Sequence, residues 1–185
     1  MRPKKLIILV EEQSMKTFLD HLLPSLGLDC EWQIIPHEGK SDLERSAPRK
    51  LRAWTDPTAD LRFIVMRDND GGNCQAIKQD IYTSCAPSGR LFLVRIVMQE
   101  LESWLLADLA AVDAAYPGRS IAGQAGKAKF RNPDMLVNAT QVIEDLTGDR
   151  GKISRADCVG SHYNLSRARS RSLRVLVEGI RRLVA

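Results

Sequence analysis

The sequence predicts an α/β fold, in which a mostly parallel four-stranded sheet has helices on both faces and is followed by a mainly helical carboxyl-terminal extension. Four short apolar runs precede Tyr116, and each is followed by a stretch with helical spacing. After Tyr116 no run is typical of a buried strand. We therefore expect a core with the sheet over residues 1–116 and a helical, basic extension over residues 117–185 that packs on the core.

The first two strands are predicted from short apolar runs. Residues 6–10 are continuously apolar and rich in branched side chains, as in a strand buried on both faces. A helix should follow with Ser14 as its N-cap, and Pro24 should end or kink it. Residues 31–36 predict the second strand.

The helix after the second strand should open with a capping box formed by Ser41 and Glu44. It should run toward Trp54, with an interruption at Pro48 because proline cannot donate the backbone hydrogen bond of a helix interior. Residues 62–66 predict the third strand.

A glycine-containing turn follows the third strand, and Asn73 should cap the next helix. Residues 91–98 predict the fourth strand, and the segment QELESWLLADLAAV should continue as one helix with an apolar face. In the extension, helices are expected over residues 134–146 and 172–184.

The composition is that of a folded globular protein, with 44% hydrophobic and 27% charged residues among 185. The apolar run near the start is too short for a secretory signal, and no segment approaches the length of a membrane span. The four cysteines lack CxxC spacing, which predicts reduced thiols instead of a zinc site or disulfides. We expect a cytoplasmic protein without membrane association.

Charge is distributed unevenly along the chain. Residues 150–185 contain nine Lys or Arg and two acids, a net +7, whereas the preceding residues carry −3 because the whole chain carries +4. A basic end on an acidic body suggests that one part holds a polyanion while another concentrates carboxylates. A solvated helix face is the competing interpretation.

Acidic residues directly follow three of the four predicted strands: Glu11, Glu12, Asp68, Asp70, Glu100 and Glu102. The carboxyl ends of parallel strands meet at one edge of a sheet, where ligand sites lie. In an extended chain Asp68 and Asp70 would face the same side, and adjacent carboxylates need a cation between them. We therefore expect Mg²⁺ or Mn²⁺ at Glu11, Asp68 and Asp70.

Other assignments at this edge stay open. Glu12 should diverge from Glu11 and face solvent, and either Glu100 or Glu102 could complete the metal site. Acids after strands are also common as helix caps or solvated loop ends, which is the alternative for all of them.

The order LIILVEEQS, FIVMRDNDGGNC and VRIVMQELESWLLAD resembles the Toprim-like (Rossmann-like) domain of the OLD-type (overcoming lysogenization defect) nucleases and their small uncharacterised single-domain relatives. Those relatives are also similar in HEGKSDLE and in the closing SRSLRVLVEGIRRL. The resemblance implies that Glu11 is the glutamate after the first strand, and that Asp68 and Asp70 are the aspartate pair that holds the catalytic metal. Glu12 departs from the family, which has glycine there.

The resemblance implies a metal-dependent nuclease that cleaves or nicks phosphodiesters, with DNA favoured over RNA. OLD-type domains are fused to ATPases, and this sequence lacks a GxxxxGK[ST] loop, so a separately encoded ATPase partner in a defence-type system is expected. Lys40 could neutralise a phosphate near the metal, and a surface lysine is the alternative. Phosphate contacts are expected from Arg155, Arg167, Arg169 and Arg171.

Two other functions compete with the nuclease. A non-catalytic Toprim-like nucleic-acid-binding or regulatory subunit would explain Glu12 in place of glycine. A receiver-like phospho-acceptor domain would need a fifth strand ending in lysine, which the sequence does not offer. A homodimer is compatible with either a nuclease or a non-catalytic subunit.

Overall fold

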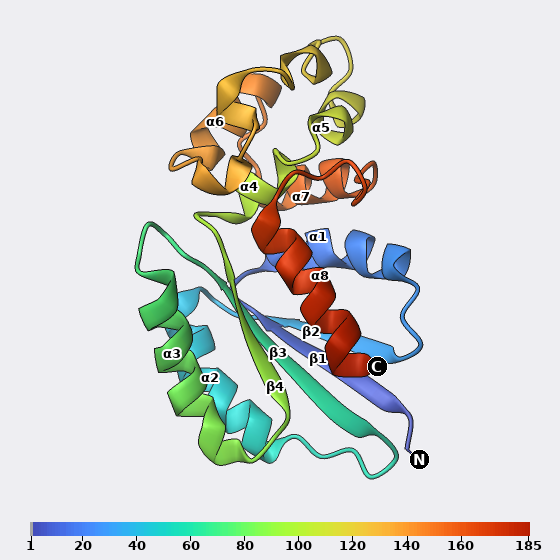
Figure 1. Cartoon of the computed structure of the whole chain (residues 1–185), viewed down its shortest axis with the longest axis vertical. Coiled ribbons are helices and arrows are strands. Elements are labelled where there is room, and N and C mark those ends of the chain that lie inside the picture. The colour runs from blue at the N-terminus through green and yellow to red at the C-terminus, as the bar shows by residue number, and fades with distance from the viewer. Residues whose placement is uncertain (1) are drawn as a thin grey trace.

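A computed structural model of the chain describes residues 2–185. Within them the sheet has four strands, all parallel, in the order β2-β1-β3-β4 (Figure 1). The strands are β1 (Lys4–Val10), β2 (Glu31–Pro36), β3 (Asp60–Asp68) and β4 (Phe92–Val97). The predicted fold class is confirmed.

Eight α-helices and five 3-10 helices are present in the described residues. The helices α1 (Gln13–Leu22), α2 (Lys40–Ala53) and α3 (Cys74–Cys85) connect successive strands. After β4 come α4 (Leu101–Leu105), α5 (Leu109–Ala115), α6 (Ala139–Thr147), α7 (Lys152–Gly160) and α8 (Arg171–Val184). The 3-10 helices are η1 (Leu23–Leu26), η2 (Ala86–Ser88), η3 (Ala122–Gln124), η4 (Ala128–Phe130) and η5 (Pro133–Met135).

The two faces of the sheet are covered by different helices, because side chains alternate along each strand. Ile7 and Leu9 of β1 belong to a core with residues of α2 and α3. Leu6, Ile8 and Val10 belong to a larger core on the other face, with residues of α1 and of the helices from α4 to α8. The strands are therefore buried on both faces, as their continuous apolar runs predict.

The segment after β4 builds a helical layer beyond the carboxyl ends of the strands and then returns to the sheet. In Figure 1 the helices α4 to α7 lie above the sheet, and α8 runs back across it toward the start of β1. On α8, Leu173, Leu176 and Ile180 are buried, and the helix contacts β1 and β4. Residues 117–185 thus share one hydrophobic core with the sheet.

The second helix, α2, differs from its prediction in two ways, at its start and at Pro48. It begins at Lys40 with Gly39 as its N-cap residue, so Ser41 and Glu44 form no capping box. It also continues through Pro48. Its buried residues Leu43, Ala47 and Leu51 lie on both sides of the proline, and their burial outweighs the missing backbone hydrogen bond.

Later helices differ in their boundaries as well. The single helix expected after β4 is two helices, because the side chain of Asp108 caps α5 by accepting a hydrogen bond from Ala111 N. The helix expected from residue 134 begins at Ala139, since the Asp134 carboxylate accepts hydrogen bonds from Ser170 and Ser172. Helix α7 was not predicted.

Besides the capping box, two N-caps were predicted, and one of the two is correct. Asn73 caps α3 by accepting from Gln75 N and Ala76 N. The N-cap residue of α1 is Glu12, and Ser14 lies inside the helix and donates to the Glu12 carboxylate. No helix in residues 2–185 combines the length and the apolar character needed to cross a bilayer.

Candidate functional site at the carboxyl edge of the sheet

Glu11 and Asp68 meet at the carboxyl edge of the sheet, as predicted, because β1 and β3 are parallel neighbours, with Val10 at the end of β1 paired to Met66 near the end of β3. The Glu11 Oε2 atom accepts a hydrogen bond from the backbone N–H of Asp68 at 3.0 Å. The Asp68 side chain is buried, and its Oδ1 atom has no hydrogen-bond partner among residues 2–185. A buried carboxylate oxygen without a partner is costly and calls for a ligand.

Burial and mutual repulsion disfavour charge on both carboxylates. Burial raises the pKa of Asp68 well above its usual range, and the neighbouring charges of Glu11 and Glu102 raise it further. The pKa of Glu11 is also raised by burial, although the hydrogen bond from Asp68 N–H opposes that shift. An added cation would relieve both effects.

Asp70 does not face the same side as Asp68 by simple strand alternation, because β3 ends at Asp68 and Asp70 is left-handed with φ 49°. Its N–H donates to the carbonyl of Gln99, which is left-handed too, with φ 65°. Left-handed residues other than glycine are uncommon and concentrate at functional sites. The Asp70 carboxylate lies 3.4 Å from Lys40 Nζ, so the structure brings these two predicted residues together.

Arg67 is one residue of the site that sequence reasoning missed. Its buried guanidinium donates to the carbonyl of Asp68 at 2.8 Å and to the carboxylate of Glu44 at 2.6 Å. It also lies 3.5 Å from Asp70 and 3.9 Å from Glu11. The signal was an arginine directly before the aspartates, at the end of a buried strand. Arg67 thus supplies part of the positive charge that the carboxylates need.

A metal ion would find oxygen ligands here, in a donor set suited to Mg²⁺ or Mn²⁺. The unpartnered Asp68 oxygen and the raised pKa of Glu11 both fit such an ion. In residues 2–185 no three His, Cys, Asp or Glu side chains already converge on a common point. The Asp70 carboxylate is instead engaged in ion pairs with Lys40 and Arg67.

A family model matches residues 10–181 and is described as Domain of unknown function (DUF4276). The chain belongs to this family. No curated protein and no solved structure matches it. The function of this DUF4276 chain therefore has to be argued from the chemistry of its residues.

The structure separates the two glutamates that follow β4 in the DUF4276 chain. Glu102 lies close enough to raise the pKa of Asp68, but its carboxylate is held by Arg155 at 2.8 Å in a buried ion pair. Glu100 points its Oε2 atom at Thr140, from which it accepts hydrogen bonds at the start of α6. Both carboxylates are thus committed to structural contacts.

Arg155 corrects a second prediction. Its side chain is fully buried and contacts Glu102 and Glu144, so it cannot reach a phosphate on the surface of the DUF4276 fold. The sequence pattern placed it with the exposed arginines because α7 was not foreseen.

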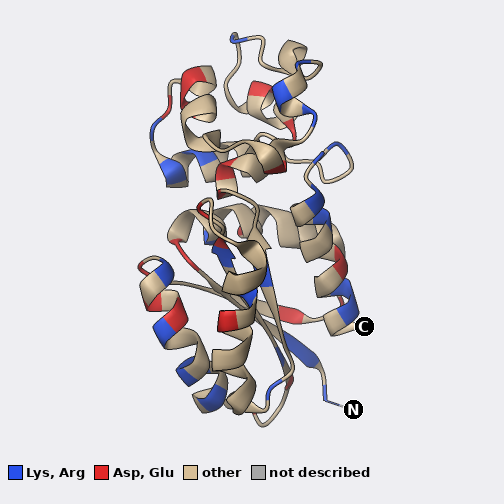
Figure 2. Cartoon of the chain, turned by 60° about the vertical axis from the view of Figure 1, so that its left-hand side comes forward, with Lys and Arg blue, Asp and Glu red and all other residues tan. Residues whose placement is uncertain are grey.

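The three other predicted arginines are exposed, on the segment before α8 and at its start. Arg167 forms an ion pair with the buried Asp108 at 2.8 Å, and Arg169 donates to the carbonyl of Ala125 at 2.7 Å. Arg171 is the first residue of α8. Arg169 and Arg171 have no acidic partner among the described residues. Figure 2 shows basic and acidic residues both in the helical layer and around the sheet.

Glu12 borders a cavity beside the carboxylates. Its carboxylate lies 3.4 Å from Lys152 Nζ at the start of α7. The cavity has a volume of about 630 Å³ and is lined by the loops after β1 and β2 together with the start of α7. Lys152 was not predicted, because its place in the site depends on a helix far along the chain. Burial lowers the pKa of Lys152, but the negative charges of Glu12, Glu102 and Asp68 outweigh it and raise the pKa above its usual range.

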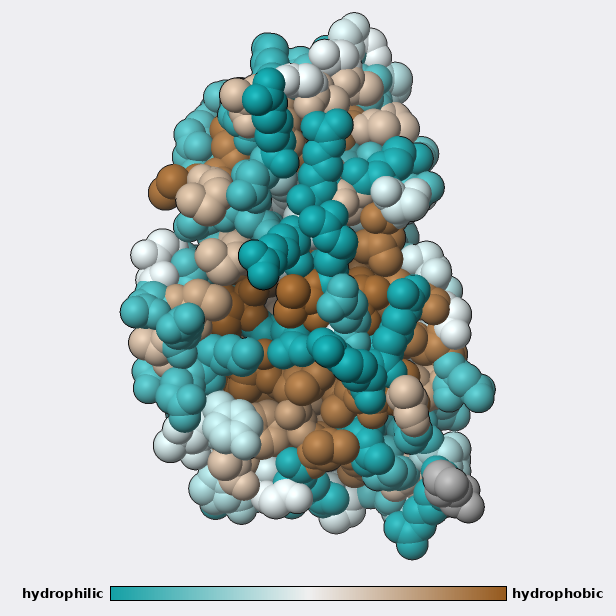
Figure 3. Space-filling view, viewed as in Figure 1, coloured by the Kyte–Doolittle hydropathy of each residue, from teal (hydrophilic) through white to brown (hydrophobic). Residues whose placement is uncertain are grey.

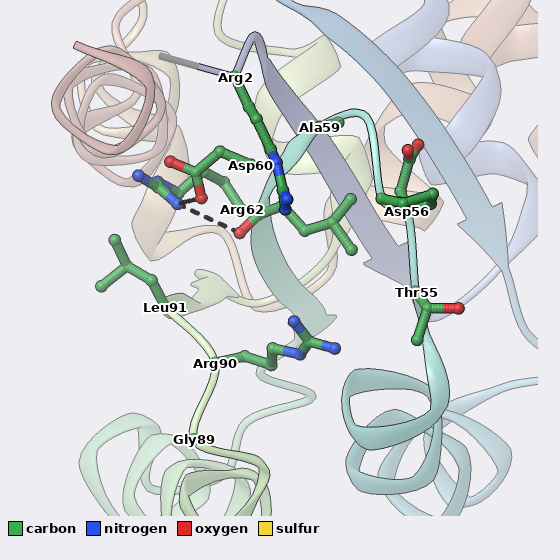
Figure 4. A pocket seen from close by; sticks show the side chains of 11 residues that line it. Arg2, Thr55, Asp56, Ala59, Asp60, Arg62, Gly89, Arg90 and Leu91 are labelled. Carbon is green, nitrogen blue, oxygen red and sulfur yellow. Dashed lines mark hydrogen bonds and ion pairs between the residues drawn. The ribbon is translucent and has the colours of Figure 1, made fainter.

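A second cavity, of about 790 Å³, lies at the opposite, amino-terminal end of the sheet (Figure 4). Its charged residues Asp56, Asp60, Arg62 and Arg90 are already engaged with other residues of the protein. Arg62 forms an ion pair with Asp60, and Arg90 donates to the carbonyls of Leu51 and Trp54. It is far from the carboxylates, and we assign the chemistry to the other edge.

Proposed function

We propose that the chain is a divalent-metal-dependent nuclease of the Toprim type. The observation that carries the proposal is the buried Asp68 carboxylate, which has an oxygen without a partner and lies beside Glu11 at the end of two adjacent parallel strands. Oxygen ligands in this position suit Mg²⁺ or Mn²⁺, held by Glu11, Asp68 and Asp70.

In this proposal each residue has a distinct task. When bound, the cation would activate water and offset charge on the phosphodiester. Glu11 and Asp68 hold it from buried positions, where their geometry is fixed by the strands. Asp70 joins them by exchanging its ion pairs, and its side chain is 40% exposed and so able to turn. Lys40, released from Asp70, is then free to meet a phosphate oxygen.

The proposed substrate is nucleic acid, with DNA favoured. Support comes from exposed arginines without acidic partners, Arg169 and Arg171, beside the helical layer. We further propose cytoplasmic action together with a separately encoded ATPase in a defence-type system. Isolation of the tagged chain from its native host would test this partner: an ATPase should co-purify, and vigorous cleavage by the chain alone would argue against dependence on it.

A second candidate is a non-catalytic Toprim-like subunit that binds or regulates. It is favoured by one specific observation, the position of Arg67 within ion-pair distance of both Asp70 and Glu11. A guanidinium there can substitute for a metal ion and leave the protein stable without one.

A nicking assay on supercoiled plasmid with Mg²⁺ or Mn²⁺ separates these candidates. The wild-type chain should nick, Asp68→Asn should not, and Asp80→Asn should behave as wild type because Asp80 is an exposed residue of α3 away from the site. Absence of nicking by the wild-type chain, alone and with its partner, would favour the non-catalytic subunit. Equal nicking by Asp68→Asn would show that another site or a contaminant cuts.

A further inference from the structure

The edge strand β4 offers backbone hydrogen-bonding groups to an additional strand. It is the last strand of the sheet, and in residues 2–185 no strand pairs with its outer side. The carbonyls of Leu91 and Val97 accept from Phe63 N and Asn69 N of the β3 side. Since backbone groups alternate in direction along a parallel strand, the intervening Phe92, Val94 and Ile96 point theirs outward. The outward carbonyl of Val94 accepts a hydrogen bond from Arg95 Nη1 at 2.9 Å, and an added strand would displace this side-chain contact at that one position.

A groove lies along this edge. Its volume is about 590 Å³, and it is bordered by β4, by α3 and by α8. Val94 and Ile96 of β4 border it as buried residues and Met98 as a half-buried one, while the exposed apolar surface comes from Met135 and Val175, with 65% and 40% of their surface exposed. Figure 3 shows hydrophobic side chains gathered on this face, with hydrophilic side chains crossing them. An exposed apolar groove along a free strand edge is the usual setting for addition of a peptide strand.

The groove also carries uncompensated positive charge. Lys78, Arg95 and Arg171 line it, and none of them forms an ion pair with an acid among the described residues. The Arg95 Nε atom is buried without a hydrogen-bond partner, and burial together with the nearby charge of Arg182 lowers the pKa of Arg95. The one acid of the lining, Asp134, already accepts hydrogen bonds from serines.

We propose that the outer edge of β4 binds an extended, acidic segment of a partner protein, which adds to the sheet as a fifth strand. The free edge supplies backbone hydrogen bonds, the apolar floor receives every second side chain, and the three cations select carboxylates on the segment. This inference does not depend on the nuclease activity proposed above.

Charge decides against a second copy of this chain as the occupant. A symmetric pairing of two β4 edges would bring Lys78, Arg95 and Arg171 close to their own copies, and like charges across paired strands are destabilising. A nucleic acid would gain from the cations but not from the apolar floor or the free backbone groups. The acidic strand is the occupant that uses all three features.

The test uses fluorescein-labelled nine-residue peptides in which valine alternates with glutamate or with lysine, followed by fluorescence anisotropy. The glutamate peptide should bind at least ten-fold more tightly than the lysine peptide. N-methylation of all glutamates and of all valines gives two further peptides. One of them should lose at least ten-fold in affinity and the other should not, because only one set of N–H groups faces β4 in a paired strand. Equal binding of both methylated peptides, or no binding of the glutamate peptide, would overturn the proposal.

Variants then locate the binding. Lys78→Glu with Arg171→Glu changes two exposed groove residues and should abolish binding of the glutamate peptide, whereas Arg49→Glu with Arg52→Glu on α2 should leave it unchanged. Amide exchange of Val94 and Ile96 should slow when the peptide is bound. If the wild-type chain self-associates and the groove variant is monomeric, the occupant of the groove is a second copy of the chain. If a DNA duplex competes with the peptide, the occupant is nucleic acid.

Discussion

The guanidinium of Arg155 lies 2.8 Å from the carboxylate of Glu102, and both side chains are closed off from solvent. The pair joins α7 to α4, two helices that are separated by about fifty residues of chain. Arg155 also donates to Glu144 and to the carbonyl of Asp149. It therefore holds together several segments of the helical layer.

Replacing Arg155 with Met should lower the free energy of unfolding by about 3–5 kcal/mol, because Glu102 would be left buried without its partner. Urea unfolding monitored by circular dichroism measures this change in the free energy of unfolding. The double variant with Glu102→Leu should recover much of the loss, since no buried charge remains. A loss below about 0.5 kcal/mol, the scale of ordinary surface changes, would show that the pair is not buried as described.

Replacing Asp68 with Asn should stabilise the protein without metal, because the change removes a buried charge that burial and Glu11 disfavour. We expect Tm to rise by about 2–4 °C, the equivalent of roughly 1 kcal/mol in a chain of this size. Millimolar Mn²⁺ should raise Tm of the wild-type chain and not of the variant. Asp80→Asn is the matched control. An equal rise in Tm of Asp68→Asn with Mn²⁺ would show that the metal does not bind at this site.

His37 should make stability fall as the pH is lowered. Burial lowers the pKa of this imidazole below its ordinary 6.5, although a hydrogen bond to the carbonyl of Val10 opposes the shift. The unfolded chain therefore binds the proton first, so the free energy of unfolding declines as pH falls below about 6.5. The decline continues down to the lower pKa of the folded state.

Unfolding in urea at pH 8, 7, 6 and 5 should show a shallower decline for His37→Asn than for the wild type. His162→Gln serves as the control, because His162 is exposed. The same slope in wild type and His37→Asn would mean that other groups cause the pH dependence.

Replacing Arg169 and Arg171 with Gln should weaken binding to a short duplex and lower the salt slope by roughly 2, about one for each phosphate that is no longer neutralised. Anisotropy over a salt series, with Ca²⁺ in place of Mg²⁺, measures both. Arg49→Gln with Arg52→Gln is the control pair, since these arginines are also exposed and donate only to backbone carbonyls. If both pairs lower the slope alike, binding is not localised beside α8.

The sheet could be predicted from the sequence because its strands are apolar runs that differ sharply from their surroundings. The runs at residues 6–10 and 62–66 each lie inside a longer strand, β1 and β3. The missing residues include charged ones, such as Lys5 and Arg67, which hydrophobicity alone assigns to loops. Helix α7 escaped prediction because it is short and its buried Arg155 looks like a surface residue.

The position of Glu11 and Asp68 followed from strand order alone, since the ends of parallel strands meet. The residues that surround these carboxylates could not be predicted from strand order. Asp70 turns because of a left-handed backbone, and Arg67 and Lys152 come near through tertiary contacts that no local pattern encodes. The ion pairs at the site thus required the structure.

The position of α8 has a consequence for how the chain folds during synthesis. One face of the sheet is covered by α2 and α3, which are synthesised between the strands, before β4 is complete. The other face receives Leu173, Leu176 and Ile180 only from α8, which follows the strands and the whole helical layer in the chain. The emerging chain must therefore keep part of an apolar sheet exposed until α8 has been synthesised, which makes that interval the one in which it depends most on chaperones.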